Sequence, residues 1–471
     1  MCGIMGVWGE ADEPAVRAMM ERVRHRGPDA DGIHHTRAGT LGHTRLSIMD
    51  VEGGDQPIHD RQGGRAIVAN GEIYNFARLR AGLSDQRFQT DSDSEPILYL
   101  YDQFGADTPR QLDGMFAFAI ADDDGLFVAR DPVGIKPLYY GRRGGAWAFA
   151  SELKALVGLV DDVREFPPGH CFHTARGFSQ YRPLPNRSPI DMSIDDHAHR
   201  VRDTLETAVE KRLMSDVEVG AFLSGGLDSS LIAAIARRKL DRLHTFSVGI
   251  EGSRDLEAAR LVSRHLDTIH HEYAFTADEA ARLLPKIVWS LESYDQDLVR
   301  SAVPCYFVSR LAADWCKVIL TGEGADELFA GYTYYHDWPT ESLHGELLRS
   351  IRSLHNVNLQ RVDRLTMHHS IEGRVPFLDM EMIATAQTVP IDLKLRKTNG
   401  RRAVEKWILR KACEDLLPHE IVWRIKEQFD EGSGSVDILA DTCRAVLPEK
   451  SVESYVSSNE AAKLRSAEEA A

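Results

Sequence analysis

A predicted strand and a predicted helix meet at the segment Leu223-Ser224-Gly225-Gly226-Leu227-Asp228-Ser229-Ser230. The apolar run 217–223 is typical of a buried strand, and residues 228–238 have the apolar spacing of a helix. Glycines let the backbone approach a ligand closely, and the first turn of a helix presents unpaired N–H groups with a partial positive charge. The segment therefore predicts a binding loop for phosphate groups. It is not a P-loop, because the chain contains no P-loop signature.

Strands and helices alternate on both sides of this segment. Helices are predicted at 201–214, 228–238 and 256–266, and strands at 217–223, 243–250, 271–275 and 317–321. Such alternation is typical of parallel strands joined by crossover helices. The last ~100 residues have a helical pattern. We therefore expect an α/β domain with a doubly wound parallel sheet and a helical tail.

Short strand-like runs separated by turn signals characterise the N-terminal part of the chain. These runs are 65–69, 115–120, 125–129 and 146–150. They predict an α+β domain of antiparallel sheets with a few helices on the faces. The polar, proline-containing stretch 182–189 is the best linker candidate. We therefore expect domains at 2–185 and 201–440, a linker at 186–200 and a short tail at 441–471.

Length and charge limit the class of protein. A chain of 471 residues is too long for one ordinary core. Its 56 Lys and Arg against 72 Asp and Glu give a formal net charge of −16, which argues against binding to nucleic acid or an anionic membrane. No run reaches the roughly 18 apolar residues of a membrane span, and no signal peptide is expected. The six scattered cysteines favour reduced thiols and a cytoplasmic enzyme with small-molecule substrates. A homodimer stays open.

Cys2 follows the initiator methionine and precedes the small residues Gly3 and Gly6. A cysteine at this position can be a coincidence. If Met1 is removed, however, the freed α-amine has a pKa of about 8 and can act as the base for the thiol of its own residue. Because a thiol is mostly protonated at neutral pH, such a base matters. One residue would then supply both the nucleophile and the base.

Four further segments resemble the class II glutamine amidotransferases in order and spacing. They are Arg24-His25-Arg26-Gly27-Pro28-Asp29, Leu46-Ser47-Ile48-Met49-Asp50 after Arg45, Asn70-Gly71-Glu72-Ile73-Tyr74-Asn75, and Ser92-Asp93. Members of that family have an Ntn-hydrolase-type αββα sandwich. Their N-terminal cysteine attacks the side-chain amide of glutamine, forms a thioester and releases ammonia. The resemblance implies this fold and this glutaminase activity for residues 2–185.

The same resemblance implies roles for individual residues. Cys2 would be the nucleophile, and the side chain of Asn70 with the backbone N–H of Gly71 would form the oxyanion hole. Alone, Asn70-Gly71 would be an ordinary hairpin turn. Residues implied to contact glutamine are Arg45, Leu46, Ser47, Ile48, Met49, Asn70, Gly71, Glu72 and Asp93.

Charge complementarity explains three of these assignments. Arg45 would pair with the glutamine carboxylate, for which a planar guanidinium is well suited. Glu72 and Asp93 would hold the α-ammonium. Asp91 departs from the family, which commonly has glycine at this position, and it adds a carboxylate near the ammonium site.

The segment 223–230 resembles the loop of the ATP-pyrophosphatases, which have an adenine nucleotide hydrolase-like fold. The resemblance implies that ATP and pyrophosphate contact Leu223, Ser224, Gly225, Gly226, Asp228, Ser229, Val248, Thr321 and Gly322. Asp228 and Asp326 would share Mg²⁺, which prefers carboxylate and phosphate oxygens. Glu323 would accept a proton during adenylate formation and ammonia attack. Lys426 would stabilise the charge of the leaving pyrophosphate.

Together the motifs resemble the glutamine-dependent asparagine synthetases from residue 2 to about residue 435. The resemblance implies that ATP activates aspartate as β-aspartyl-AMP and that ammonia from glutamine displaces AMP. Arg300 and Asp379 would bind the acceptor. Amidation of another carboxylic acid stays open, because Asp297 adds a negative charge where some synthetases have a threonine-rich segment. Glu323 argues against the relatives that close β-lactam rings, which carry tyrosine there, and a non-catalytic scaffold would not need Cys2.

Overall fold

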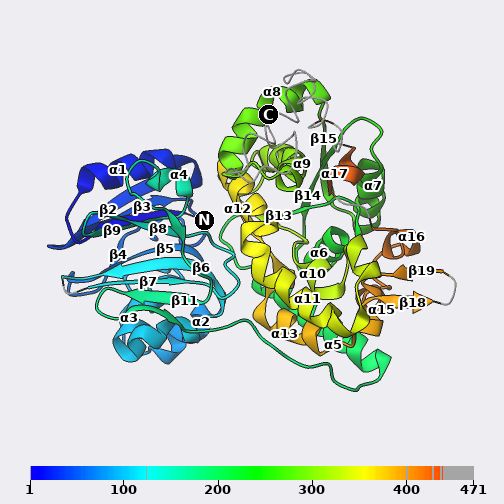
Figure 1. The fold of residues 1–471 in the computed structure, drawn as a ribbon, viewed down its shortest axis with the longest axis horizontal. Coiled ribbons are helices and arrows are strands. Elements are labelled where there is room, and N and C mark those ends of the chain that lie inside the picture. Colours follow the sequence, from blue (N-terminus) through cyan, green and yellow to red (C-terminus); the bar gives the residue numbers. More distant parts are fainter. Residues whose placement is uncertain (1, 124, 399–400, 427–428, 435–437, 439–471) are drawn as a thin grey trace.

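A computed structural model of the chain describes residues 2–123, 125–398, 401–426, 429–434 and 438. The predicted tail at 441–471 lies outside the described residues, as do Glu427 and Gln428 after Lys426. None of the described helices is both long enough and apolar enough to cross a membrane. Figure 1 shows two domains side by side, with the N-terminus near the boundary between them.

The N-terminal domain is a sandwich of two antiparallel sheets. Its strands are β1 (Gly3–Trp8), β2 (Ala30–His35), β3 (Gly39–Arg45), β4 (Ile58–His59), β5 (Ala66–Ile73), β6 (Gly114–Ala121), β7 (Leu126–Arg130), β8 (Tyr139–Arg143), β9 (Ala146–Ala150), β10 (Arg164–Glu165), β11 (His170–His173) and β12 (Gly177–Gln180). The first sheet has the order β10-β8-β9-β1-β3-β2 and the second the order β12-β11-β7-β6-β5-β4.

Helices cover the two outer faces of this sandwich. They are α1 (Glu13–Arg22), α4 (Leu153–Leu156), α2 (Phe76–Gly82) and α3 (Pro96–Phe104). Figure 1 shows α1 and α4 against one sheet and α2 and α3 against the other. Strand β1 is buried on both faces because Ile4 packs between the sheets while Met5 and Val7 pack toward α1. The predicted αββα sandwich is confirmed.

A five-stranded parallel sheet forms the centre of the C-terminal domain. Its strands are β13 (Val219–Phe222), β14 (His244–Gly249), β15 (Ile269–Ala274), β16 (Val318–Leu320) and β17 (Glu372–Arg374). Their order is β15-β14-β13-β16-β17, and every neighbouring pair is parallel. The direction of winding reverses between β13 and β16, which is where ligands bind in open α/β sheets.

Helices pack on both faces of the parallel sheet. They are α5 (Ile194–Lys211), α6 (Leu227–Arg237), α7 (Arg254–Leu266), α8 (Ala277–Leu291), α9 (Gln296–Ala312), α10 (Ala325–Phe329), α11 (Thr340–Ser353), α12 (Asn358–His368), α13 (Met380–Thr388), α14 (Ile391–Lys394), α15 (Trp407–Ala412), α16 (His419–Val422) and α17 (Phe429–Ser433). Val318 and Leu320 of β16 pack in the cluster that contains α5, α6 and α7, while Ile319 packs in the cluster of α8, α9 and α12. The doubly wound sheet is confirmed. A hairpin of β18 (Arg396–Thr398) and β19 (Arg401–Val404) interrupts the helical C-terminal part.

The connection between the domains has no regular structure from residue 181 to residue 193. Helix α5 begins at Ile194, where the hydroxyl of Ser193 accepts a hydrogen bond from the backbone nitrogen of Asp196 at 3.1 Å. A serine in this position satisfies a free N–H group of the first turn. The helix therefore starts inside the stretch 186–200 that the sequence indicated as linker.

Candidate active sites

The first site lies where the N-terminus of the chain meets strand β5. Cys2 directly precedes β1 and is 7% exposed. Its backbone nitrogen donates a hydrogen bond to Oδ1 of Asn70 at 3.0 Å, so the two sheets together position this pair. Burial raises the pKa of the Cys2 thiol. A base is therefore needed beside the thiol before it can act as a nucleophile near neutral pH.

Asn70 and Gly71 have the properties of an oxyanion hole. Nδ2 of Asn70 is buried and has no hydrogen-bond partner within the described residues. An unsatisfied buried donor is costly, so an acceptor from a bound molecule fits this position. Gly71 has a φ of +147°, and a Cβ there would lie 2.0 Å from the carbonyl oxygen of Met115. Only glycine therefore fits at position 71.

Backbone carbonyls surround the guanidinium group of Arg45. It donates to the carbonyl oxygens of Val51 at 3.1 Å, Met49 at 3.3 Å and Asp50 at 2.6 Å. Its ion pair with Asp55 spans 2.8 Å, and the side chain of Asp55 is 69% exposed while that of Arg45 is 6% exposed. A substrate carboxylate could therefore replace the exposed Asp55 beside a guanidinium that is already held in place.

Three carboxylates near this site differ in their surroundings. Asp93 accepts a hydrogen bond from a backbone N–H of β5 at 2.6 Å, and burial raises its pKa to about 6. Glu72 is 3% exposed and pairs with Arg374 of the C-terminal domain at 3.3 Å. The side chain of Asp91 is 90% exposed and pairs with Arg80 at 3.2 Å. The extra charge of Asp91 thus lies at the surface.

The segment after Arg45 lies at the domain boundary. Leu46 and Ile48 are buried in an apolar cluster that continues into the C-terminal domain. The backbone nitrogen of Ser47 donates to Asp29 at 2.8 Å, and Asp29 also pairs with Lys317 of the C-terminal domain at 2.7 Å. The predicted glutamine pocket is therefore built against the second domain.

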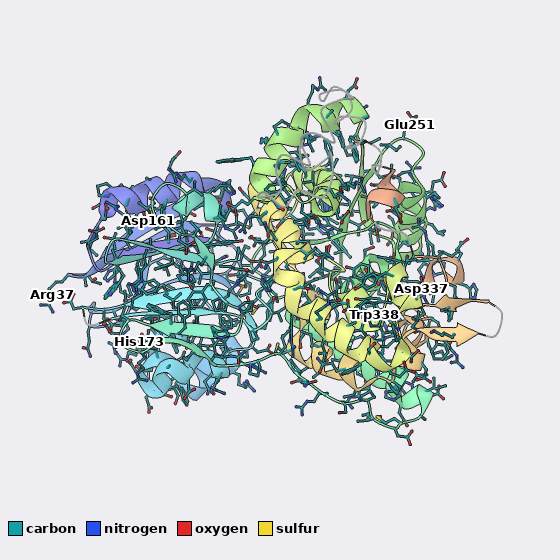
Figure 2. The ribbon with its side chains drawn as sticks, viewed as in Figure 1. Arg37, Asp161, His173, Glu251, Asp337 and Trp338 are labelled. Atoms are coloured by element: carbon teal, nitrogen blue, oxygen red, sulfur yellow. The ribbon has the colours of Figure 1, made fainter. Side chains whose placement is uncertain are left out.

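A buried guanidinium connects Cys2 to the C-terminal domain. Arg26 is fully buried and donates to the carbonyl oxygen of Cys2 at 3.1 Å. It also pairs with Glu152 at 2.8 Å and with Asp363 of α12 at 2.8 Å. Asp363 in turn accepts from Arg364 at 3.0 Å. Side chains fill the space between the two domains (Figure 2), and this network is part of that contact.

The second site is a cavity of about 760 Å³ at the carboxyl ends of β13, β14 and β16. These ends flank the reversal of strand order, and the first turn of α6 lines the cavity. A helix N-terminus is suited to phosphate. The lining includes the predicted residues Leu223, Ser224, Gly226, Asp228, Ser229, Val248, Thr321, Gly322, Glu323, Asp326 and Lys426.

Gly225 does not line the cavity, although the sequence assigned it to nucleotide binding. It has a φ of +72°, and a Cβ there would lie 2.5 Å from the backbone nitrogen of Ala259 in α7. The position requires glycine because of this close contact with a neighbouring helix. Its effect on a nucleotide is therefore indirect, through the path of the loop.

Two lysines hold the two predicted metal-binding aspartates. Nζ of Lys406 lies 2.5 Å from Oδ2 of Asp228 and 2.5 Å from Oδ1 of Asp326. Nζ of Lys426 lies 3.0 Å from Asp326 and 3.9 Å from Asp228. Lys406 is 1% exposed and was not predicted, because nothing in its sequence neighbourhood distinguishes it from an ordinary surface lysine.

The aspartate pair fits a divalent cation that arrives with phosphate. Asp228 and Asp326 face a shared positive charge, and Oδ1 of Asp228 has no hydrogen-bond partner within the described part of the chain. The described residues contain no group of three or more His, Cys, Asp or Glu side chains suited to a metal. A cation here would need additional oxygen ligands, and Mg²⁺ commonly takes them from substrate phosphates and water.

The two residues implied for acceptor binding do not line the cavity. Asp379 is 3% exposed and pairs with Lys211 at 3.1 Å and Arg212 at 3.0 Å. Its side chain also caps α13, so its oxygens serve the packing of helices. Arg300 lies on α9, which contributes Asp297, Leu298, Ser301 and Val308 to the lining instead.

Comparisons with known proteins match both domains. The family model described as a glutamine amidotransferase domain matches residues 1–167, and the one described as asparagine synthase matches residues 200–343 and 337–470. Glutamine-hydrolysing asparagine synthetase 3 of Arabidopsis thaliana is 40% identical over 461 residues, covering 92% of this chain and 79% of that protein. Glutamine-hydrolysing asparagine synthetase 2 of Oryza sativa subsp. japonica is 40% identical over 469 residues, with 92% and 78% covered.

A more distant similarity is found among solved structures. The glutamine phosphoribosylpyrophosphate amidotransferase from B. subtilis, complexed with ADP and GMP, is 23% identical with a TM-score of 0.35. That match covers 52% of this chain and 65% of the other. The family matches and the curated relatives, by contrast, extend over both domains described above. The chain therefore belongs to the glutamine-hydrolysing asparagine synthetases.

Proposed function

We propose that this enzyme converts aspartate, glutamine, ATP and water to asparagine, glutamate, AMP and pyrophosphate, with Mg²⁺ and in the cytoplasm. The observation that carries the proposal is the presence of two separate sites in one chain. One contains a buried cysteine bonded to Asn70, and the other a cavity with Glu323 beside a phosphate-binding loop. Ammonia made in the first site is consumed in the second.

In the glutaminase site, removal of Met1 makes the nitrogen of Cys2 an amine beside Oδ1 of Asn70. The amine takes the thiol proton, and the thiolate sulfur attacks the amide carbon of glutamine. The side-chain N–H of Asn70 and the backbone N–H of Gly71 stabilise the oxyanion. The amine returns its proton to the leaving ammonia. Water then hydrolyses the thioester to glutamate.

In the synthetase site, the β-carboxylate of aspartate attacks the α-phosphorus of ATP and pyrophosphate leaves. Asp228 and Asp326 would hold Mg²⁺, which neutralises phosphate charge when bound. Lys406 and Lys426 already lie against these aspartates, so their ammonium groups are placed to stabilise the leaving pyrophosphate. Ammonia attacks the activated carbonyl carbon, AMP leaves, and Glu323 accepts the proton. The ion pair with Arg361 orients the Glu323 carboxylate.

The test separates the two sites by mutation. We expect Cys2→Ala to abolish asparagine formation from glutamine and to retain formation from ammonium chloride, because ammonia bypasses the first site. Cys171→Ala, which changes another buried cysteine of the same domain, should retain both activities. Products are measured by mass spectrometry on protein whose Met1 has been removed. The proposal would be contradicted if Cys2→Ala, but not Cys171→Ala, lost asparagine formation from both glutamine and ammonium chloride. It would also be contradicted if the unmodified enzyme formed no asparagine.

A further inference from the structure

One end of the synthetase cavity contains charged groups that the nucleotide site does not use. Glu323 precedes α10 and Glu327 lies four residues later, while Asn358 and Arg361 lie three residues apart on α12. Asn358 and Arg361 therefore share a face of α12. Arg361 donates to Glu323, and Nδ2 of Asn358 donates to Oε1 of Glu327 at 3.3 Å. All four residues line the cavity.

Two polar atoms at this end have no hydrogen-bond partner among the described residues. One is Oε2 of Glu327, a residue that is 2% exposed, and the other is Nε of Arg361, a residue that is 6% exposed. The hydroxyl of Tyr332 donates to Oε1 of Glu327 at 2.6 Å, so only the second oxygen is unsatisfied. Buried acceptors and donors are normally paired, and leaving them unpaired costs free energy. A bound molecule with one cationic and one anionic group would satisfy both atoms.

We infer that Glu327 and Arg361 bind the α-amino acid group of the acceptor. Glu327 accepts a hydrogen bond from the α-ammonium, and the guanidinium of Arg361 donates to the α-carboxylate. The inference rests on the proposed function and adds the two residues that recognise the acceptor as an α-amino acid rather than a plain dicarboxylic acid. The reacting carboxylate then lies toward Glu323.

Electrostatics at this end of the cavity favour an ammonium group. A cation beside a buried carboxylate favours its ionised form. A dicarboxylic acid without an amine would bring only negative charge to a region that already contains Glu323, Asp326 and Glu327. The site therefore selects against such an acid.

The other arginines near the acceptor end are less suited to this role. Arg300 does not line the cavity. Arg349 does, but its side chain is 65% exposed and already pairs with Glu346. An exposed pair contributes little because water screens it. Arg361 is buried and retains an unsatisfied donor, so a carboxylate bound there gains more.

The experiment combines substrate analogues with variants. ATP–pyrophosphate exchange is measured with aspartate, with succinate, which lacks the ammonium, and with aspartate α-amide, which lacks the α-carboxylate charge. The unmodified enzyme should prefer aspartate to either analogue by ~100-fold or more in kcat/KM, because a site with buried polar groups rejects molecules that leave them unpaired.

Each variant should lose one discrimination only. Glu327→Gln should reduce the preference for aspartate over succinate to ~10-fold or less, mainly through KM, and keep the preference over the α-amide. Arg361→Met should reduce the preference for aspartate over the α-amide and keep the preference over succinate. Glu346→Gln, which changes a buried carboxylate of α11 outside the lining, should keep both preferences. Retained glutamine hydrolysis checks that each variant folds.

Two outcomes separate this inference from the proposed function. The inference would be overturned if Glu327→Gln kept the full preference for aspartate over succinate, or if each variant lost both preferences to the same extent. In either case, aspartate-dependent exchange in the unmodified enzyme would still support the proposed function. Absence of exchange with aspartate would refute the function. Binding of aspartate and its analogues, measured by thermal shift in the same proteins, would then still decide whether Glu327 recognises an ammonium.

Discussion

The buried ion pair between Arg26 and Asp363 should contribute strongly to the association of the two domains. Asp363 is 4% exposed and accepts from Arg26 at 2.8 and 3.1 Å and from Arg364 at 3.0 Å. Asp363→Asn keeps the shape and one acceptor oxygen but removes the negative charge. Because breaking a buried pair from one side costs roughly 3–5 kcal/mol, and Arg26 keeps Glu152, we expect a loss of about 3 kcal/mol.

The assay is urea unfolding followed by tryptophan fluorescence and by circular dichroism, since coincident transitions are needed for a single free energy of unfolding. Glu13→Gln is the control, because its pair with Arg17 is exposed and should contribute less than about 0.5 kcal/mol. Arg26 also bonds the carbonyl oxygen of Cys2, so Asp363→Asn should in addition raise the glutamine consumed per asparagine formed. Equal stability of the two variants would refute the assigned role of this network.

Two further predictions concern single positions. Asp93 has a pKa raised to about 6, so its carboxylate becomes protonated as the pH falls through that value. The KM for glutamine should then rise on acidification, and an Asp93→Asn variant that keeps this dependence would contradict the assignment. Gly225→Ala should abolish ATP–pyrophosphate exchange but not glutamine hydrolysis. The left-handed φ at this position costs an alanine about 1–2 kcal/mol, and the alanine Cβ would collide with the backbone of Ala259. Gly345→Ala, where a Cβ meets nothing within 4 Å, should leave exchange unchanged, and equal exchange in both variants would refute this argument.

Local pattern predicted four of the described strands of the N-terminal domain and missed the other eight, among them the central strand β1. The runs 65–69, 115–120, 125–129 and 146–150 correspond to β5, β6, β7 and β9, because apolar residues bounded by turns favour strands. Strand β1 was not among the predicted strands, because it contains Gly3 and Gly6 and glycine is depleted in strands. It forms because both of its faces are buried, which removes the alternation that marks a half-exposed strand.

The acceptor site could not be predicted in the same way. The family resemblance implied that Asp379 binds the acceptor, yet Lys211 and Arg212 at the end of α5 pair with its carboxylate. Lys406 lies in the turn before α15 and Arg361 lies on α12, and neither is part of a distinctive sequence spacing. Their importance follows from the carboxylates beside them, and those carboxylates come from other elements.

Motif order and local spacing were enough to predict the two classes of domain and to propose Cys2 as nucleophile and 223–230 as a phosphate loop, because each depends on neighbouring residues in the chain. Which charged side chains form ion pairs could be seen only in the tertiary structure. Arg26 and Asp363 are 337 positions apart, and no local pattern states that burial will force them together. Charges cannot be buried alone at an acceptable free energy, so the fold decides which of them meet.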